Sequence, residues 1–184
     1  MAGMTNPFTT LSSRTAYQNR WLRIREDRIL HKDGSPGLYG VVERTDFVVI
    51  VPFRDGSVAL VEQYRYPVGE RVWEFPMGSM PDPASGITPA AAAAMELREE
   101  TGMTADRLDH VGSIFQGPGY CTQRGHIFLA RDLRDGEPER EASELDMVCA
   151  WITIPKLETM IRDGRLCESM TLSAFSLLRL RGFL

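Results

Sequence analysis

Cysteine is scarce in this sequence: Cys121, Cys149 and Cys167 lie far apart and form no CxxC pair. An odd, scattered set gives neither a zinc-ligand spacing nor a disulfide framework, and it is typical of a reducing cytoplasm. Long apolar runs are also lacking, since no stretch approaches the roughly 18 residues of a membrane span. The start, MAGMTNPFTTLSSR, lacks the basic segment and apolar core of a signal peptide. These absences predict a cytoplasmic protein that does not enter a membrane.

A surplus of positive charge is missing as well, because 21 Lys and Arg residues stand against 25 Asp and Glu residues, for a net charge of −4. This balance argues against broad binding to nucleic acids or to anionic membranes. The sequence contains no GxxxxGK[ST] and no GxGxxG motif, so neither a P-loop nor a Rossmann fold is supported. An anionic ligand would therefore need metal ions or a few well-placed arginines.

The length of 184 residues suits one domain with a small N-terminal appendage. Residues 1–15 have no strong pattern, and we expect a loose arm there. Residues 21–30 and 38–44 flank the turn cluster HKDGSPG and predict a strand pair. We therefore divide the chain into an N-terminal arm and strand pair, residues 1–45, and a main domain, residues 46–184.

The main domain begins with strands, has one helix in its middle, and ends with helices. Predicted strands cover residues 47–53, 57–66, 72–75, 109–115, 124–130 and 147–153, and predicted helices cover residues 89–101, 155–163 and 169–181. Between the third strand and the first helix lies a loop rich in Gly, Pro and Ser. This order of elements predicts an α/β sandwich with a mixed β-sheet.

The middle helix carries the clearest chemical signal. Thr88 can cap its start and Gly102 can end it in the left-handed conformation. Within MELREETGM, the residues Glu96, Glu99 and Glu100 share one helix face, where like charges oppose the helix by a few tenths of a kcal/mol per pair. Such a cluster is usually a solvated face. Clustered carboxylates are, however, also hard ligands for Mg²⁺, and a cation would offset their repulsion.

The segment ELREETGM resembles the second half of the box of the Nudix hydrolases, G-x5-E-x7-R-E-U-x-E-E-x-G-U, in which U is a bulky apolar residue. The stretch from Asp46 to Gly78 and the segment QGPGYCTQRGHIFLA resemble the ADP-ribose and ADP-sugar pyrophosphatase branch. This resemblance implies a Nudix-type α/β/α sandwich with a mixed sheet and a small N-terminal β segment. It also implies Mg²⁺- or Mn²⁺-dependent hydrolysis of ADP-ribose, or a related nucleoside diphosphate sugar, to AMP and a sugar phosphate.

Two other functions stay open. Pro118 lies sixteen residues after Gly102, where a proline accompanies ADP-ribose preference in the family, but the nearby Tyr120 keeps dinucleoside polyphosphates as alternative substrates. The chain also departs from the box, because Ile87 and Met95 stand where the family has a paired Glu and Arg. A catalytically weak nucleotide-binding regulator is therefore the second alternative.

The joint loss of both charges has a simple physical reading. Losing one partner of a buried ion pair strands a charge, whereas losing both to apolar residues can be neutral or stabilising. We therefore predict that Ile87 and Met95 form an apolar clasp in place of the ionic one, and that the metal ligands are kept. Compared with the box of the family, the segment SMPDPAS contains about three additional residues.

The family resemblance assigns a metal site to the acidic helix. It implies that Glu96 and Glu100 bind the metal, with Glu99 beside them as a further ligand or catalytic carboxylate. The backbone carbonyl of Met77 is expected to add a ligand. A catalytic base is expected from the loop at residues 137–146, which offers Glu141, Glu144 and Asp146, and we favour Glu144 over the alternative of an ordinary solvated acidic loop.

The same resemblance assigns the substrate contacts. Trp21 and Tyr39 fall where related enzymes place rings that sandwich the adenine, often one from each subunit of a homodimer; outside the family context, a lone Trp in a strand is more often a core residue. Arg44 and Arg65 match arginines that contact the diphosphate or the sugar, a role for which the guanidinium fork is suited. Either could instead be a surface arginine. Glu74 is expected to face the same cleft.

Overall fold

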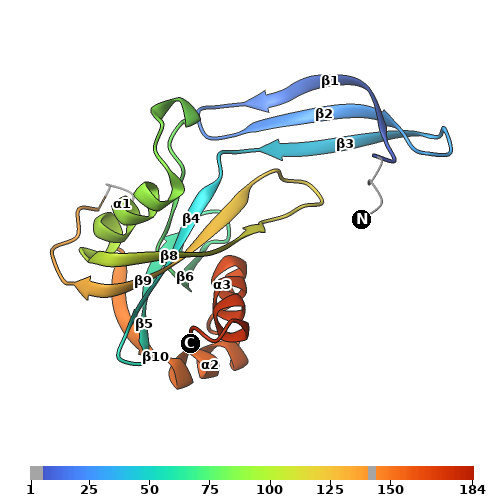
Figure 1. Cartoon of the computed structure of the whole chain (residues 1–184). Coiled ribbons are helices and arrows are strands. Elements are labelled where there is room, and N and C mark those ends of the chain that lie inside the picture. The colour runs from blue at the N-terminus through green and yellow to red at the C-terminus, as the bar shows by residue number, and fades with distance from the viewer. Residues whose placement is uncertain (1–5, 141–143) are drawn as a thin grey trace. The chain divides into compact units, whose positions relative to one another are not determined.

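The computed structural model describes residues 6–140 and 144–184. The chain divides into two compact units, which are described separately (Figure 1). Unit 1 consists of the chain through Thr45 together with Phe115–Gln123, and unit 2 consists of Asp46–Ile114 and Arg124–Leu184.

Unit 1 is built on a three-stranded antiparallel sheet. Its strands are β1 (Thr9–Gln18), β2 (Arg23–Leu30) and β3 (Pro36–Glu43), in that order. The expected pair of β2 and β3 is confirmed. The expectation of a loose arm was wrong from Thr9 onward, because β1 pairs along the whole of β2. Residues 1–5 of that arm lie outside the described residues. All ten residues of β1 are exposed, so burial gave this strand no apolar pattern that could be read from the sequence.

The loop at Phe115–Gln123 belongs to unit 1 through backbone hydrogen bonds to β3. The Val42 N–H donates to the Tyr120 carbonyl at 2.7 Å, and the Thr122 N–H donates to the Val42 carbonyl at 3.1 Å. These bonds hold the loop that carries Pro118 against the end of the three-stranded sheet.

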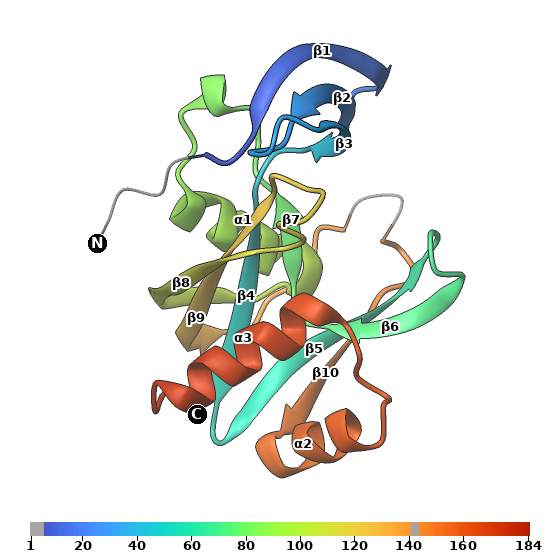
Figure 2. The ribbon, with the colours of Figure 1, turned by 90° about the vertical axis from the view of Figure 1, so that its right-hand side faces the viewer.

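Unit 2 contains a mixed sheet with the strand order β10-β5-β4-β9-β8 (Figure 2). Two short strands extend it, because β6 pairs with β5 and β7 pairs with β4. The pairing of β4 with β9 is parallel, whereas β5 pairs in antiparallel fashion with β4, β6 and β10. The strands are β4 (Phe47–Arg54), β5 (Ser57–Arg65), β6 (Glu70–Glu74), β7 (Met77–Ser79), β8 (Thr104–Phe115), β9 (Arg124–Arg134) and β10 (Val148–Thr153).

Helices cover both faces of this sheet. One core cluster joins alternate residues of β4, such as Val49, to α2 (Ile154–Arg162) and α3 (Ser169–Leu180). The other joins the intervening residues, such as Val48, to α1 (Pro89–Thr101). A strand buried on both faces has no polar side, which explains its continuous apolar run. The predicted α/β/α sandwich with a mixed sheet is confirmed.

Several elements differ from the sequence-based prediction. Met77–Ser79 forms β7 and Pro83–Ser85 forms a short 3-10 helix, both within the segment predicted as a loop. Strand β8 begins at Thr104, directly after α1, and is longer than predicted. No helix among the described residues is long and apolar enough to cross a membrane.

The predicted ends of α1 are confirmed. The Thr88 hydroxyl accepts a hydrogen bond from the Ala91 N–H at 3.2 Å. Gly102 has φ +75° and its N–H donates to the Arg98 carbonyl at 2.8 Å. A Cβ at this glycine would also overlap the backbone of Gly136, so both conformation and packing require glycine here.

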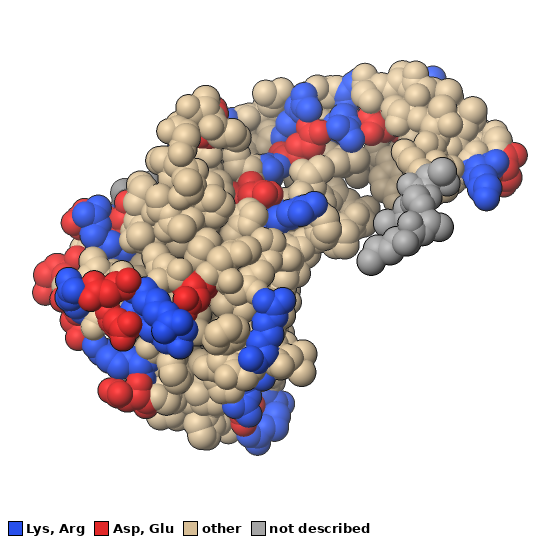
Figure 3. Space-filling model, viewed as in Figure 1, with Lys and Arg blue, Asp and Glu red and all other residues tan. Residues whose placement is uncertain are grey.

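Acidic and basic side chains are intermixed over the face drawn in Figure 3. The ion pairs of the described residues include Arg107 with Asp109 along β8, at 3.0 Å. Exposed pairs of this kind contribute little to stability.

Candidate active site

The acidic face of α1 packs against β7. Glu100 is only 1% exposed, and one of its carboxylate oxygens accepts a hydrogen bond from the Met77 N–H at 3.3 Å. The Glu96 carboxylate lies directly on Gly78, where a Cβ would overlap it. Glycine at position 78 therefore allows a carboxylate to rest against the strand backbone. Glu99 is half-buried on the same helix.

The pKa of Glu100 is raised well above its usual range. Burial is the main cause, and the charges of Glu96, Glu144 and Glu74 raise it further, while the Met77 N–H opposes the shift. Three carboxylates from three separate segments therefore act on the buried carboxylate of Glu100. A bound cation would offset this repulsion more effectively than solvent does.

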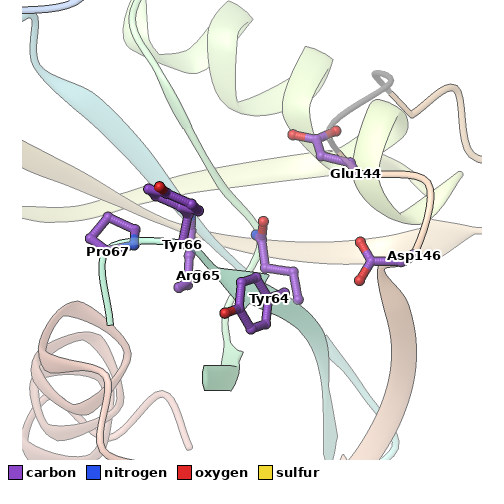
Figure 4. Close-up of a pocket in the computed structure, with 7 residues that line it drawn as sticks. Tyr64, Arg65, Tyr66, Pro67, Glu144 and Asp146 are labelled. Atoms are coloured by element: carbon purple, nitrogen blue, oxygen red, sulfur yellow. The ribbon is translucent and has the colours of Figure 1, made fainter. Parts of the chain in front are cut away.

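A pocket of about 580 Å³ opens next to these carboxylates (Figure 4). Its lining comes from the end of β5 and the following turn on one side, and from the loop before β10 on the other. The lining residues are Gln63, Tyr64, Arg65, Tyr66, Pro67, Glu144 and Asp146. The pocket therefore combines one guanidinium, two aromatic rings and two carboxylates.

The structure separates the three candidate bases of the loop before β10. Glu144 lines the pocket and its charge acts on Glu100. Asp146 also lines the pocket, but its carboxylate is paired with Arg71 at 2.7 Å. Glu141 lies outside the described residues. Glu144 is thus the candidate whose position agrees with the prediction.

Glu74 forms an ion pair with Arg65, which lines the pocket. It is 1% exposed, and its carboxylate pairs with the Arg65 guanidinium at 2.6 Å and accepts a hydrogen bond from the Gln63 amide at 2.7 Å. Burial raises the pKa of Glu74, and the charge of Arg65 is the main opposing influence. The sequence predicted that Glu74 faces the cleft. In the structure its side chain is buried in the ion pair with Arg65 and is not part of the pocket lining.

The predicted adenine-binding rings both belong to unit 1. Trp21 is 61% exposed in the turn between β1 and β2, with the Arg20 guanidinium 4.0 Å from its ring centre. Tyr39 is 40% exposed within β3, and its ring meets the edge of Phe8 at 5.9 Å. Arg44 and Pro118 are exposed in the same unit.

Register shows that these two rings are far apart along the sheet. Tyr39 pairs with Asp27, whereas Arg23, two residues after Trp21, pairs with Glu43. Four residues of strand correspond to roughly 13 Å, so the rings of one chain do not face each other across a single base.

Comparison with known proteins places the chain in a family. The model of the nucleoside diphosphate sugar hydrolase N-terminal domain matches residues 8–42, and the model of the NUDIX domain matches residues 43–168. The chain belongs to the NUDIX family. The resemblance drawn from the acidic helix and its flanking segments is thereby confirmed.

Relatives within the NUDIX family cover most of the chain. An ADP-ribose pyrophosphatase of Mycobacterium tuberculosis is 32% identical over 90% of this chain and 80% of its own length. An ADP-ribose pyrophosphatase of Bacillus subtilis is 29% identical over 79% of this chain and 74% of its own. A crystal structure of an ADP compounds hydrolase superimposes with a TM-score of 0.85, over 97% of both chains at 23% identity, which supports the NUDIX fold.

The carboxylates of this NUDIX site suit a hard divalent cation, which NUDIX enzymes require. No three Asp, Glu, His or Cys side chains among the described residues are grouped closely enough to hold a metal by themselves. Mg²⁺, however, commonly binds through one or two carboxylates, with waters and substrate phosphates completing its shell. Glu96 and Glu100 supply two such carboxylates, and the charge of Glu96 raises the pKa of Glu100. These two residues therefore fit a site of this kind.

The two departures from the NUDIX box have different surroundings. Ile87 packs against the core cluster under α1, next to the N-cap Thr88, and the same cluster contains Ala92. Ile87 directly precedes the N-cap and Ala92 follows it by four residues, which is the spacing of a hydrophobic staple. Met95 is 41% exposed. The predicted clasp between Ile87 and Met95 is therefore not supported by their burial.

Sequence reasoning missed several residues of the NUDIX site. Tyr64 and Tyr66 line the pocket together with Arg65. Their position on either side of Arg65 in QYRYP was the signal in the sequence that could have identified them. Gln63 was missed as the partner of Glu74. Arg140, which bonds to the end of α1, had no signal in the sequence because its partners are backbone carbonyls.

Proposed function

We propose that this NUDIX protein is a pyrophosphohydrolase of ADP-ribose or a closely related nucleoside diphosphate sugar, yielding AMP and a sugar phosphate. The observation that carries the proposal is the buried Glu100, surrounded by the charges of Glu96 and Glu144, beside a pocket that presents Arg65. The two relatives named ADP-ribose pyrophosphatase support the choice of substrate.

In this proposal, Glu96 and Glu100, together with the Met77 carbonyl, hold Mg²⁺ or Mn²⁺, with Glu99 as a further ligand. A bound metal would neutralise charge at the diphosphate and would lower the pKa of the attacking water. Glu144 accepts a proton from the attacking water as the new O–P bond forms. The bridging P–O bond of the diphosphate breaks at the same time, and one phosphate leaves with its electron pair.

Substrate binding is assigned to arginines and aromatic rings. Arg65, held by Glu74, is placed to form two parallel hydrogen bonds to the diphosphate, for which a guanidinium is better suited than an ammonium. Arg44 is a second phosphate or sugar contact. Trp21 and Tyr39 are assigned to the adenine, and Pro118 to the loop that accompanies ADP-ribose preference.

A homodimer is part of the proposal. Trp21 and Tyr39 do not face each other within one chain, so a sandwiched adenine needs rings from two chains. Unit 1 also exposes large apolar side chains, including Leu11, Tyr17 and Leu38, on a small sheet that gains little from its own burial. A second copy, with twofold symmetry, would cover this surface. The absence of disulfides among the three cysteines supports a cytoplasmic location.

The test is a substrate panel with Mg²⁺, Mn²⁺ or EDTA. The panel contains ADP-ribose, other ADP-sugars, GDP-sugars and dinucleoside polyphosphates, and the products are separated by ion-exchange chromatography. We expect metal-dependent release of AMP, fastest from ADP-ribose. Preference for dinucleoside polyphosphates would select the alternative substrate class. No metal-dependent turnover of any compound, with nucleotide binding retained, would instead indicate a regulator.

A further inference from the structure

The segment before β10 is tied to the carboxyl end of α1. The backbone of Gly136 packs against Gly102, so closely that a Cβ on Gly102 would overlap it. The Glu139 N–H then donates to the Glu99 carbonyl at 3.0 Å. The Arg98 and Glu139 side chains add an exposed ion pair at 3.3 Å. The first part of this segment therefore follows the last turn of the helix.

Arg140 forms the innermost of these links. Its Nε donates to the Glu100 carbonyl at 3.1 Å, and its Nη1 donates to the Met147 carbonyl. One half-buried guanidinium thus joins the end of the helix to the start of β10. The last carbonyls of a helix have no partner within the helix and carry partial negative charge, so a cation is well matched to this position.

We propose that Arg140 is a positioning residue, which fixes the loop carrying Glu144 against the helix face that carries Glu96 and Glu100. This inference rests on the proposed function, because it concerns the placement of the base relative to the metal ligands. Glu144 lies between the two ends of the link, and its carbonyl accepts a hydrogen bond from the Met147 N–H at 2.9 Å.

The partners of Arg140 show why it suits this role. Its two hydrogen bonds go to backbone carbonyls, one at Glu100 near the end of α1 and one at Met147, three residues after Glu144. They hold the backbone beside Glu144 to the end of α1, and Arg140 itself is not among the residues that line the pocket. A lysine would keep the charge, but its single ammonium does not reproduce the planar fork that spans two carbonyls.

The test compares Arg140→Met and Arg140→Lys with Arg98→Met, which removes only the exposed ion pair at the same junction. Turnover of ADP-ribose with Mg²⁺ gives kcat and KM, and amide hydrogen exchange is followed at Glu139 and Met147 in the metal-free protein. For Arg140→Met we expect kcat to fall about 10- to 100-fold, as for other supporting partners of a metal site, with KM changed less than about threefold. Exchange at both amides should quicken. Arg140→Lys should recover part of each loss, and Arg98→Met should resemble the wild type.

Two results would overturn the inference. One is unchanged exchange at Glu139 and Met147 in Arg140→Met, and the other is quickened exchange with an unchanged kcat. Should Arg140→Met fail to fold, Arg140→Lys carries the test with the same two measurements. A wild-type protein without any metal-dependent turnover would refute the proposed function, and the exchange data would then decide separately whether Arg140 anchors the loop.

Discussion

The buried carboxylate of Glu100 is unfavourable for folding and suitable for binding a cation. Its carboxylate is buried among other carboxylates, and its hydrogen bond to the Met77 N–H offsets only part of that cost. Polar groups placed at a loss to stability are common at functional sites. At the residue scale, the acidic cluster is therefore explained better by ligand binding than by folding.

We predict that Glu100→Gln stabilises the metal-free protein while abolishing metal-dependent hydrolysis. Removing the buried charge should raise the free energy of unfolding by about 0.5–2 kcal/mol at pH 7 in EDTA. Because the folded-state pKa of Glu100 is raised, the wild type loses stability as pH rises from the ordinary glutamate value of about 4.3 through the raised pKa. The advantage of the variant should therefore be largest above that window and vanish below it.

Urea unfolding in EDTA between pH 4 and pH 8 measures this difference. Glu70→Gln, at an exposed glutamate of β6, is the matched control and should change stability little at any pH. A Glu100→Gln protein that is less stable than the wild type at pH 7 would show that the carboxylate contributes to folding.

At the scale of elements, apolar packing holds the start of α1. Ile87 is anchored in the cluster beneath the helix, and Thr88 caps the first turn. Met95 lies on the exposed side of the helix and is free to vary without disturbing that cluster. The helix that presents Glu96 is thus held from its amino end by a staple and a cap.

We predict unequal, additive effects at the two altered box positions. Ile87→Glu should lower the free energy of unfolding by about 1–3 kcal/mol, because it places a charge against the core. Met95→Arg should change it by less than about 0.5 kcal/mol, as expected at an exposed site. Thermal and urea unfolding of both variants and of the double variant provide the measurement. Recovery of more than about 0.5 kcal/mol in the double variant would show that the two side chains meet after all.

At the scale of the whole molecule, the two units contribute different chemistry. Unit 2 contains the acidic helix, the pocket and Arg65, and unit 1 contains the exposed rings of Trp21 and Tyr39. A small sheet with a fully exposed strand gains little from its own packing, so its stability depends on what covers it. A second copy of the chain is the covering surface that we propose.

We predict that the protein is a homodimer and that Trp21→Ala raises KM for ADP-ribose with a smaller change in kcat. Stacking on a flat ring should act equally in the ground state and the transition state, which is why the loss should fall on KM. Light scattering should give about twice the monomer mass. Leu180→Ala, at an exposed apolar residue of α3, is the control and should alter neither constant. A monomer that hydrolyses ADP-ribose at full rate would exclude a shared site.

The sequence by itself determined the features that depend on local pattern. The cap at Thr88, the left-handed turn at Gly102 and the acidic face of α1 follow from residue type and helical spacing. The continuous apolar run at residues 47–53 indicated a buried strand. These signals are local because hydrogen bonding and periodicity within one element produce them.

Only the tertiary structure decided which distant residues meet. Glu144 and Arg140 lie in a segment without periodicity, so neither the hydrogen bond of Arg140 to α1 nor the pairing of Asp146 with Arg71 could be derived from spacing. Strand β1 escaped prediction because it buries no side chain and is defined by backbone pairing alone. Long-range contacts of this kind arise from chain closure and packing, which leave no regular mark on the order of the residues.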